Sequence, residues 1–123
     1  MSALGTPVLL LDSITEAVHH PTGAVVVCGS HGGRSSARYA LEAQPRLVVF
    51  NDAGVGKDRA GIAALEILLA AGIAACAVAH DSARIGDAGS TWHDGVIAHL
   101  NRAAEALGAQ RGLRIRDWLQ QAP

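Results

Sequence analysis

The chain has 123 residues, of which 50% are hydrophobic and 3% aromatic, and its formal net charge is −1. That length suits a single domain spanning residues 1–123, and the small aliphatic composition favours packed α/β layers over an aromatic-rich β-sandwich. The near-zero net charge argues against a nucleic-acid-binding protein, whose surface needs a clear excess of lysine and arginine.

Signals for export or membrane insertion are not expected either. The N-terminal stretch has a short apolar run without a basic segment before it, so we expect no signal peptide. No apolar stretch approaches the roughly 20 residues that span a bilayer, so we expect no membrane partner. Cys28 and Cys76 both lie within apolar runs, which favours buried, reduced thiols and a cytoplasmic location.

Four short apolar runs predict β-strands, at residues 8–11, 24–28, 47–50 and 74–79. The two middle runs are continuous and rich in valine instead of alternating, which is typical of strands covered on both faces. Helical segments alternate with these strands, and such alternation predicts a mainly parallel sheet of about four strands. The expected fold is α/β, a single three-layer domain of Rossmann-like or flavodoxin-like type.

Several helix boundaries can be predicted from the residues that cap them. Residues 13–16, Ser-Ile-Thr-Glu, have the spacing of a capping box. Asp58 is expected to cap the start of the helix that Gly72 ends. The remaining expectations are one long last helix from Ser90 or Thr91 to Gly108, and a short amphipathic segment at residues 112–122.

Polar, glycine-rich loops follow three of the predicted strands. All strand C-termini of a parallel sheet lie on one edge, and ligands of α/β proteins bind in the crevice there. We therefore expect the three loops to converge, and they hold most of the side chains able to do chemistry. Their sequences are GSHGGRSS at 29–36, NDAGVGKD at 51–58 and HDSARIGDAGST at 80–91.

Four residues of these loops are candidate catalytic residues: His31, Asp52, His80 and Ser82. Imidazole titrates near neutral pH and a carboxylate can orient it, so His31 and Asp52 are the expected acid–base pair. His80 and Ser82 would assist, the serine as a hydroxyl that binds substrate or as a nucleophile. The alternatives are a histidine bonded to backbone, an aspartate that caps the glycine turn, and a serine that caps the next turn.

Cationic side chains and glycine N–H groups in the same loops predict binding of a small anion such as a carboxylate or phosphate. Three glycines in the first loop suggest that the backbone approaches something closely. Salt bridges from the cations to Asp58 and Asp87 are the alternative. The candidate substrate-binding residues are Ser30, Gly32, Gly33, Arg34, Asn51, Gly54, Lys57 and Arg84.

No cofactor is expected from the motifs. A divalent metal held by His31, Asp52 and His80 is a minor alternative, because no spacing in the chain is typical of metal ligands. Residues 51–58 imitate a phosphate-binding G-x-x-x-x-G-K-[ST] loop, but Asn51 and Asp58 replace its first glycine and its hydroxyl, which argues against an NTPase. The remaining histidines are expected to be structural or exposed: His19, His20, His93 and His99.

Two partial resemblances concern the first loop and the overall outline. The stretch at 27–32, Val-Cys-Gly-Ser-His-Gly, resembles the strand-end Ser-His-Gly of caspase-like cysteine peptidases over about six residues. The next strand of that family ends in its nucleophilic cysteine, whereas here residues 50–53 read Phe-Asn-Asp-Ala, so peptidase activity is not implied. The α/β outline is similar to flavodoxin-like domains, although the loops lack aromatic residues to sandwich a flavin.

The sequence thus predicts a small cytosolic enzyme that acts on a small anionic metabolite by hydrolysis or acid–base proton transfer. The alternative is a non-catalytic metabolite-binding domain or an accessory subunit of a larger enzyme. A homo-oligomer is also expected, because a lone sheet of this size leaves its edges exposed.

Overall fold

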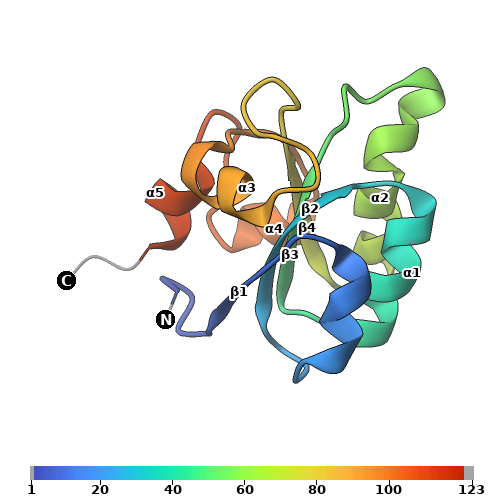
Figure 1. Cartoon of the computed structure of the whole chain (residues 1–123). Helices are drawn as coiled ribbons and strands as arrows, with labels where there is room; N and C mark the ends of the chain where they lie inside the picture. The colour runs from blue at the N-terminus through green and yellow to red at the C-terminus, as the bar shows by residue number, and fades with distance from the viewer. Residues whose placement is uncertain (1, 121–123) are drawn as a thin grey trace.

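The computed structural model, described for residues 2–120, is a five-stranded sheet with helices on both faces (Figure 1). The first four strands are parallel, and the fifth is antiparallel to the fourth. The predicted α/β three-layer fold is confirmed, with one strand more than expected. The strands lie in chain order across the sheet: β1 (Val8–Leu11), β2 (Val25–His31), β3 (Leu47–Asn51), β4 (Ala74–Val78) and β5 (Ile97–Leu100).

Two hydrophobic cores lie on the two faces of the sheet. Residues alternate along each strand, so Val48 and Phe50 of β3 enter one core while Leu47 and Val49 enter the other. Figure 1 shows α1 and α2 on one side of the sheet and α3, α4 and α5 on the other. The first face carries η1 (Ile14–His19), α1 (Arg34–Ala43) and α2 (Ala63–Ala70); the second carries α3 (Ala88–Asp94), α4 (Arg102–Ala106) and α5 (Ile115–Leu119).

Two of the predicted helix boundaries are confirmed by hydrogen bonds. Ser13 and Glu16 form the capping box at the start of η1. At the end of α2 the N–H of Gly72 donates to the Leu69 carbonyl and that of Ile73 to Leu68, both at 2.9 Å. This is the Schellman arrangement, and Gly72 has the left-handed φ of +77° that it requires.

The predicted cap at Asp58 is wrong. Asp58 lies inside a tight 3₁₀ segment, η2 (Lys57–Ile62), and α2 begins only at Ala63. Asp58 and Arg59 both have left-handed backbone angles, with φ of 55° and 59°. Helix N-caps need extended backbone, so Asp58 cannot take that role here.

The predicted long last helix is also wrong, because it is divided into α3, β5 and α4. Asp87, not Ser90 or Thr91, caps α3 by accepting from the Ser90 N–H at 3.0 Å. A Cβ on Gly95 would lie only 2.8 Å from Val78 Cγ1, so the chain turns tightly against β4 at that glycine. The chain then enters the sheet as an edge strand.

A buried asparagine ends the fifth strand. The Asn101 side chain caps α4 through the Ala104 N–H (2.9 Å) and accepts the Ala75 N–H (3.1 Å). Its amide group donates to the carbonyls of Leu65 and Ile73, each at 3.0 Å. One side chain therefore joins α2, β4 and α4.

The tail was expected to form an amphipathic segment at residues 112–122. Its helix, α5, buries Ile115 and Leu119 completely in the second core. The expectation is confirmed for the part of the segment that the structure describes; residues 121 and 122 lie outside it. None of the helices within residues 2–120 has the length and apolar content needed to cross a bilayer.

The direction of the connections changes between β3 and β4. The chain leaves β3 toward α2 on the first face, and it leaves β4 toward α3 on the second face. Neighbouring loops that diverge to opposite faces open a crevice at the carboxyl ends of the strands, which is where open α/β sheets bind ligands.

Candidate functional site: a buried carboxylate between two histidines

Asp52 lies at the point where the two connections diverge. It follows β3 and is only 4% exposed. Its Oδ1 accepts hydrogen bonds from the backbone N–H of Gly54 at 2.8 Å and of His80 at 2.9 Å. These bonds join the loop after β3 to the loop after β4, so the carboxylate is held in one orientation.

Two imidazole rings approach this carboxylate, one toward each oxygen. His80 Nδ1 lies 3.4 Å from Oδ1, and His99 Nε2 lies 3.3 Å from Oδ2. The His80 side chain is 60% exposed, whereas that of His99 is 24% exposed. The carboxylate thus faces two rings through different nitrogens, which leaves Nε2 of His80 and Nδ1 of His99 on the far sides.

A β-bulge brings His99 into this cluster. His99 pairs with Ala77 and Ile97 pairs with Val78, so Ala98 is an extra residue in β5. Ile97 and His99 would otherwise share one face of the sheet, but Ile97 lies in the core of the second face while Ala77 belongs to that of the first. Bulges that redirect a side chain are frequent beside active sites.

The loop after Asp52 has unusual backbone geometry. Positive φ angles occur at Ala53, Val55, Asp58 and Arg59, besides the glycines at 54 and 56. Each non-glycine residue in this region has a conformational cost, and such residues cluster at ligand sites and switches. Gly54 also lies beside the His80 ring, about 3.7 Å from a Cβ built on it.

His31 lies apart from this cluster. It ends β2 as an exposed residue, and its Nδ1 accepts the Gly33 N–H at 3.1 Å. Within residues 2–120 the ion pairs of Asp52 are those with His80 and His99, so the structure does not bring His31 within 4 Å of that carboxylate. His31 instead lines a smaller hollow of about 200 Å³ with Ser30 and Tyr39.

The glycines of the first loop make close approaches to other parts of this protein. A Cβ on Gly29 would lie 2.7 Å from the Gly86 Cα, and one on Gly32 would lie 2.9 Å from the Gly61 carbonyl oxygen. The Gly32 N–H donates to the Asn51 carbonyl at 3.1 Å. The predicted close approach is thus real, but its partners are segments of the same chain, and the N–H groups of Gly32 and Gly33 are occupied.

Three of the predicted polar residues make hydrogen bonds to backbone. Ser82 Oγ donates to the Ala79 carbonyl at 2.7 Å and accepts the Val96 N–H at 3.0 Å. The Asn51 Nδ2 donates to the Ala83 carbonyl, and its Oδ1 accepts the Ala53 N–H. The Ser30 hydroxyl oxygen accepts the Ile14 N–H. These side chains position the loops around Asp52.

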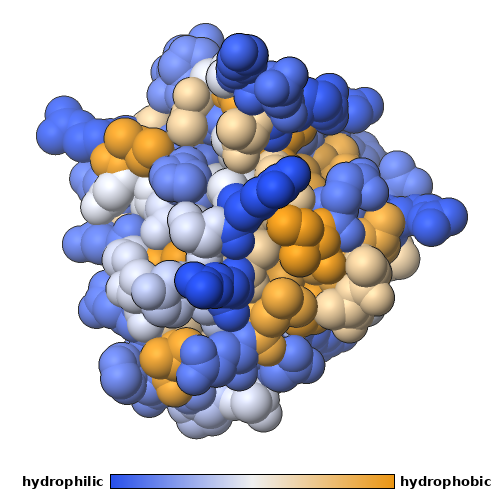
Figure 2. All heavy atoms as spheres, turned by 90° about the vertical axis from the view of Figure 1, so that its right-hand side faces the viewer, coloured by the Kyte–Doolittle hydropathy of each residue, from blue (hydrophilic) through white to orange (hydrophobic). Residues whose placement is uncertain are grey.

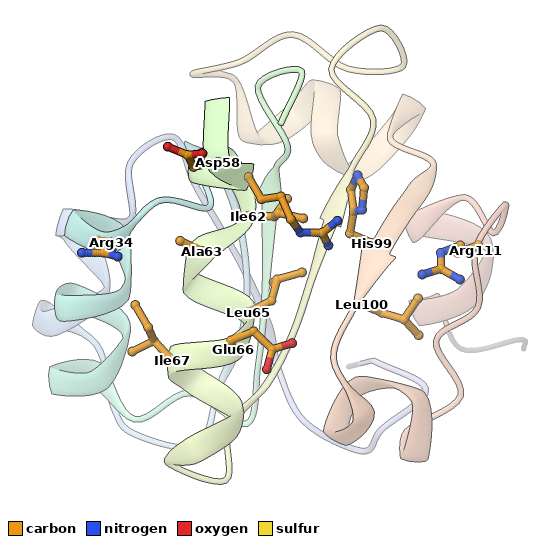
Figure 3. A pocket seen from close by; sticks show the side chains of 11 residues that line it. Arg34, Asp58, Ile62, Ala63, Leu65, Glu66, Ile67, His99, Leu100 and Arg111 are labelled. Atoms are coloured by element: carbon orange, nitrogen blue, oxygen red, sulfur yellow. The ribbon is translucent and has the colours of Figure 1, made fainter. Parts of the chain in front are cut away.

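A groove lies beside the cluster, between α2 and β5, and its lining continues past α2 toward α1 (Figure 3). Its volume is about 390 Å³, and His99 is part of its wall. Of the three predicted anion-binding cations, Arg34 lines the groove, whereas Lys57 and Arg84 are exposed residues outside its lining. Arg59 and Arg111, which the sequence reasoning did not select, line it as well.

His99 is the main residue that the sequence reasoning missed. Within residues 2–120, no three histidine, cysteine, aspartate or glutamate side chains gather closely enough to hold a metal ion. No protein-family model, curated protein or solved structure matches the chain. The function proposed below therefore depends on the geometry of the site.

Proposed function

We propose that the chain is an enzyme that acts on a small anionic molecule by general acid–base catalysis, and that Asp52, His80 and His99 carry the chemistry. The supporting observation is the buried carboxylate with one imidazole on each oxygen. Imidazole is the side chain best suited to accept and release protons near neutral pH, and a carboxylate beside the ring is the usual companion of such a group in acid–base sites.

The two rings have different surroundings, which suggests different roles. His99 is mostly buried and lines the groove, so it is the group that can meet a bound molecule. His80 is 60% exposed and can exchange its proton with water. In the proposed reaction one ring removes a proton from the substrate or from an attacking water, and the other ring donates a proton to the product or leaving group. Proton exchange of both rings with water then restores the starting state.

Proton transfer can be tested without knowing the substrate. Small 2-oxo acids, hydroxy acids and phosphorylated carbonyl compounds are incubated with the protein in D₂O, and deuterium at the carbon beside the carbonyl is measured by NMR. A parallel panel of small carboxylate esters and phosphate esters tests hydrolysis. We expect turnover of at least one compound, and about 100-fold or greater loss in His99→Gln and Asp52→Asn.

His20→Gln is the matched control, because His20 is exposed at the end of η1, outside the carboxylate cluster and the groove lining. Full turnover in both His99→Gln and Asp52→Asn would contradict the proposal. Tight binding of a panel compound without any turnover, surviving loss of both histidines, would favour the alternative of a non-catalytic metabolite-binding domain.

We also propose a cytosolic setting and a homo-oligomer. Cys28 and Cys76 are buried and free, as expected in a reducing compartment. Leu10, on the edge strand β1, is 45% exposed, and an apolar side chain on an open strand edge favours pairing with a second copy. Sedimentation at several concentrations tests the oligomer directly, and a monomer at all of them would contradict it.

A further inference from the structure

The groove between α2 and β5 exists because the edge strand is covered on one face only. The helix α2 packs over β4, whereas α3, α4 and α5 belong to the core of the opposite face. In Figure 3, Ile62 at the end of η2 and Leu65 and Glu66 of α2 lie across from His99 and Leu100 of β5. A volume of about 390 Å³ falls in the range of small-molecule sites.

The groove is continuous with the proposed catalytic cluster through one residue. His99 lines the groove, and its Nε2 lies 3.3 Å from Asp52 Oδ2. A molecule lying in the groove would therefore contact the ring that faces the buried carboxylate. No other residue of the cluster lines the groove within the described part of the chain.

The lining combines an apolar wall with cations. Ile62 and Leu65, at the start of α2, are 4% and 5% exposed, and the half-buried Leu100 of β5 lies opposite them; together they are the apolar wall of the groove. Figure 2, which views the molecule from the side of α1 and α2, shows apolar surface on this face bordered by polar side chains. Such a wall suits an aliphatic chain a few carbons long.

The lining also includes the carboxylates of Asp58 and Glu66 and three arginines: Arg59, Arg111 and, on the α1 side of α2 in Figure 3, Arg34. Among residues 2–120, none of these arginines has a carboxylate within 4 Å, since the ion pairs there are those of Asp52 with its two histidines. Arg111 donates through Nε to the Ala98 carbonyl at 3.2 Å, which holds its guanidinium over β5. Unpaired guanidinium groups are suited to bind a carboxylate or phosphate.

We infer that this groove binds the substrate of the proposed reaction, and that the substrate is a small amphipathic anion: a carboxylate or phosphate head on a short aliphatic chain. That the bound molecule is a substrate rests on the proposed function. The binding itself follows from the apolar wall, the unpaired arginines and the position of His99. Arg59 and Arg111 hold the head, and the wall of Ile62, Leu65 and Leu100 receives the chain.

Binding can be measured with two ladders of simple probes, independently of turnover. Linear carboxylates from acetate to octanoate and the matching alkyl phosphates are titrated by calorimetry and by NMR of the imidazole signals. We expect affinity to rise about twofold to fourfold per methylene while the chain lies in the groove. The His99 signal is expected to shift on binding. The series that binds more tightly, carboxylates or alkyl phosphates, identifies the head group that the groove prefers.

Removing a positive charge and removing a negative charge from the groove should change the affinity for the probes in opposite directions. Arg59→Gln and Arg111→Gln should each weaken binding by about twofold to tenfold. Glu66→Gln should strengthen it, because this exposed carboxylate in the lining repels an anion. Arg102→Gln, on exposed α4, is the matched control and should bind as the unmodified protein does.

Affinity that does not depend on chain length, or that is unchanged in both arginine variants, would overturn the inference. The two proposals can fail separately. If the panel compounds turn over but the ladders do not bind in the groove, the enzyme proposal stands and the groove inference is wrong. If the ladders bind as described and nothing turns over, the groove is a binding site and the enzyme proposal is wrong.

Discussion

Replacing Asp52 by asparagine and by alanine separates its structural role from its chemical role. Oδ1 accepts the N–H groups of Gly54 and His80 at 2.8 and 2.9 Å, while Oδ2 faces only His99 among the described residues. An asparagine can keep its amide oxygen on both N–H groups and present its amide nitrogen to His99. It retains the hydrogen bonds of the loops and loses the negative charge.

The expected stabilities follow from these bonds. Asp52→Ala removes two charge-assisted hydrogen bonds, whose donors belong to exposed residues that water can reach, so we expect a loss of about 2–3 kcal/mol. Asp52→Asn replaces them by neutral bonds of roughly half the strength, a loss of about 1 kcal/mol. The unfolding entropy of a 123-residue chain, about 0.26 kcal/mol per kelvin, converts these losses to about 10 °C and 4 °C in Tm.

Urea and thermal unfolding followed by circular dichroism measure the stabilities, and the proton-exchange and ester panels measure activity. We expect Asp52→Asn to be folded and inactive. Asp81→Asn, an exposed carboxylate beside His80, is the control and should change neither property. Equal destabilisation by asparagine and alanine would refute the reasoning, because it would mean that the charge on Asp52 stabilises the loops more than its hydrogen bonds do.

Three further predictions concern the neighbouring loops and the core. Gly29→Ala should lower the free energy of unfolding in urea by about 3 kcal/mol or more, because the new Cβ would overlap backbone atoms. Gly56 has open space around it, so Gly56→Ala should lose only about 1–2 kcal/mol, the strain of a side chain at positive φ. Ser82→Ala should lose about 1–2 kcal/mol through its two backbone hydrogen bonds and keep its turnover; an inactive but folded variant would restore the serine as a nucleophile. Burial raises the pKa of Cys28 and Cys76 from 9.0 to about 12, so both should resist a thiol reagent at pH 8 until urea is added. The thiols ionise at lower pH in the unfolded chain than in the folded protein. The free energy of unfolding should therefore fall above pH 9, by about 1.4 kcal/mol for each thiol and each pH unit, and the Cys28→Ala variant should show a smaller fall.

The parallel core of the fold could be predicted from the sequence because its signals are local. The runs of β3 and β4 are short, apolar and bounded by turn residues, and their predicted ranges differ from the observed ones by one residue each. The end of α2 at Gly72 was equally readable, because a left-handed residue after an apolar helix is usually glycine.

The fifth strand could not be predicted in the same way. Residues 96–100 read Val-Ile-Ala-His-Leu, and Val96 and Leu100 also have the spacing of one helical face. A strand of four residues is too short to outweigh that pattern, and its pairing with β4 is a contact between distant parts of the chain. Gly95 and Asn101, which bound this run, were the available signals of a strand.

The error over the fifth strand carried over to the site. As a residue of a long helix, His99 has no reason to lie near a loop almost 50 positions earlier. The bulge at Ala98 is a further step that no pattern in the sequence indicates, because it depends on how β5 meets β4. The convergence of Asp52 and His80 was predictable because both follow parallel neighbouring strands.

The two oxygens of Asp52 divide the electrostatic influence of the carboxylate unequally between the rings. Oδ1 already accepts two backbone N–H groups before His80 approaches at 3.4 Å, and those donors reduce the negative charge available to an exposed ring. Oδ2 has His99 at 3.3 Å and no other partner among the described residues, and the His99 side chain is only 24% exposed. Solvent screens this second pair less, so the negative charge of Asp52 acts more strongly on the His99 ring than on the His80 ring. Because His99 is also the ring that lines the groove, the carboxylate acts most strongly on the imidazole that a bound anion would meet.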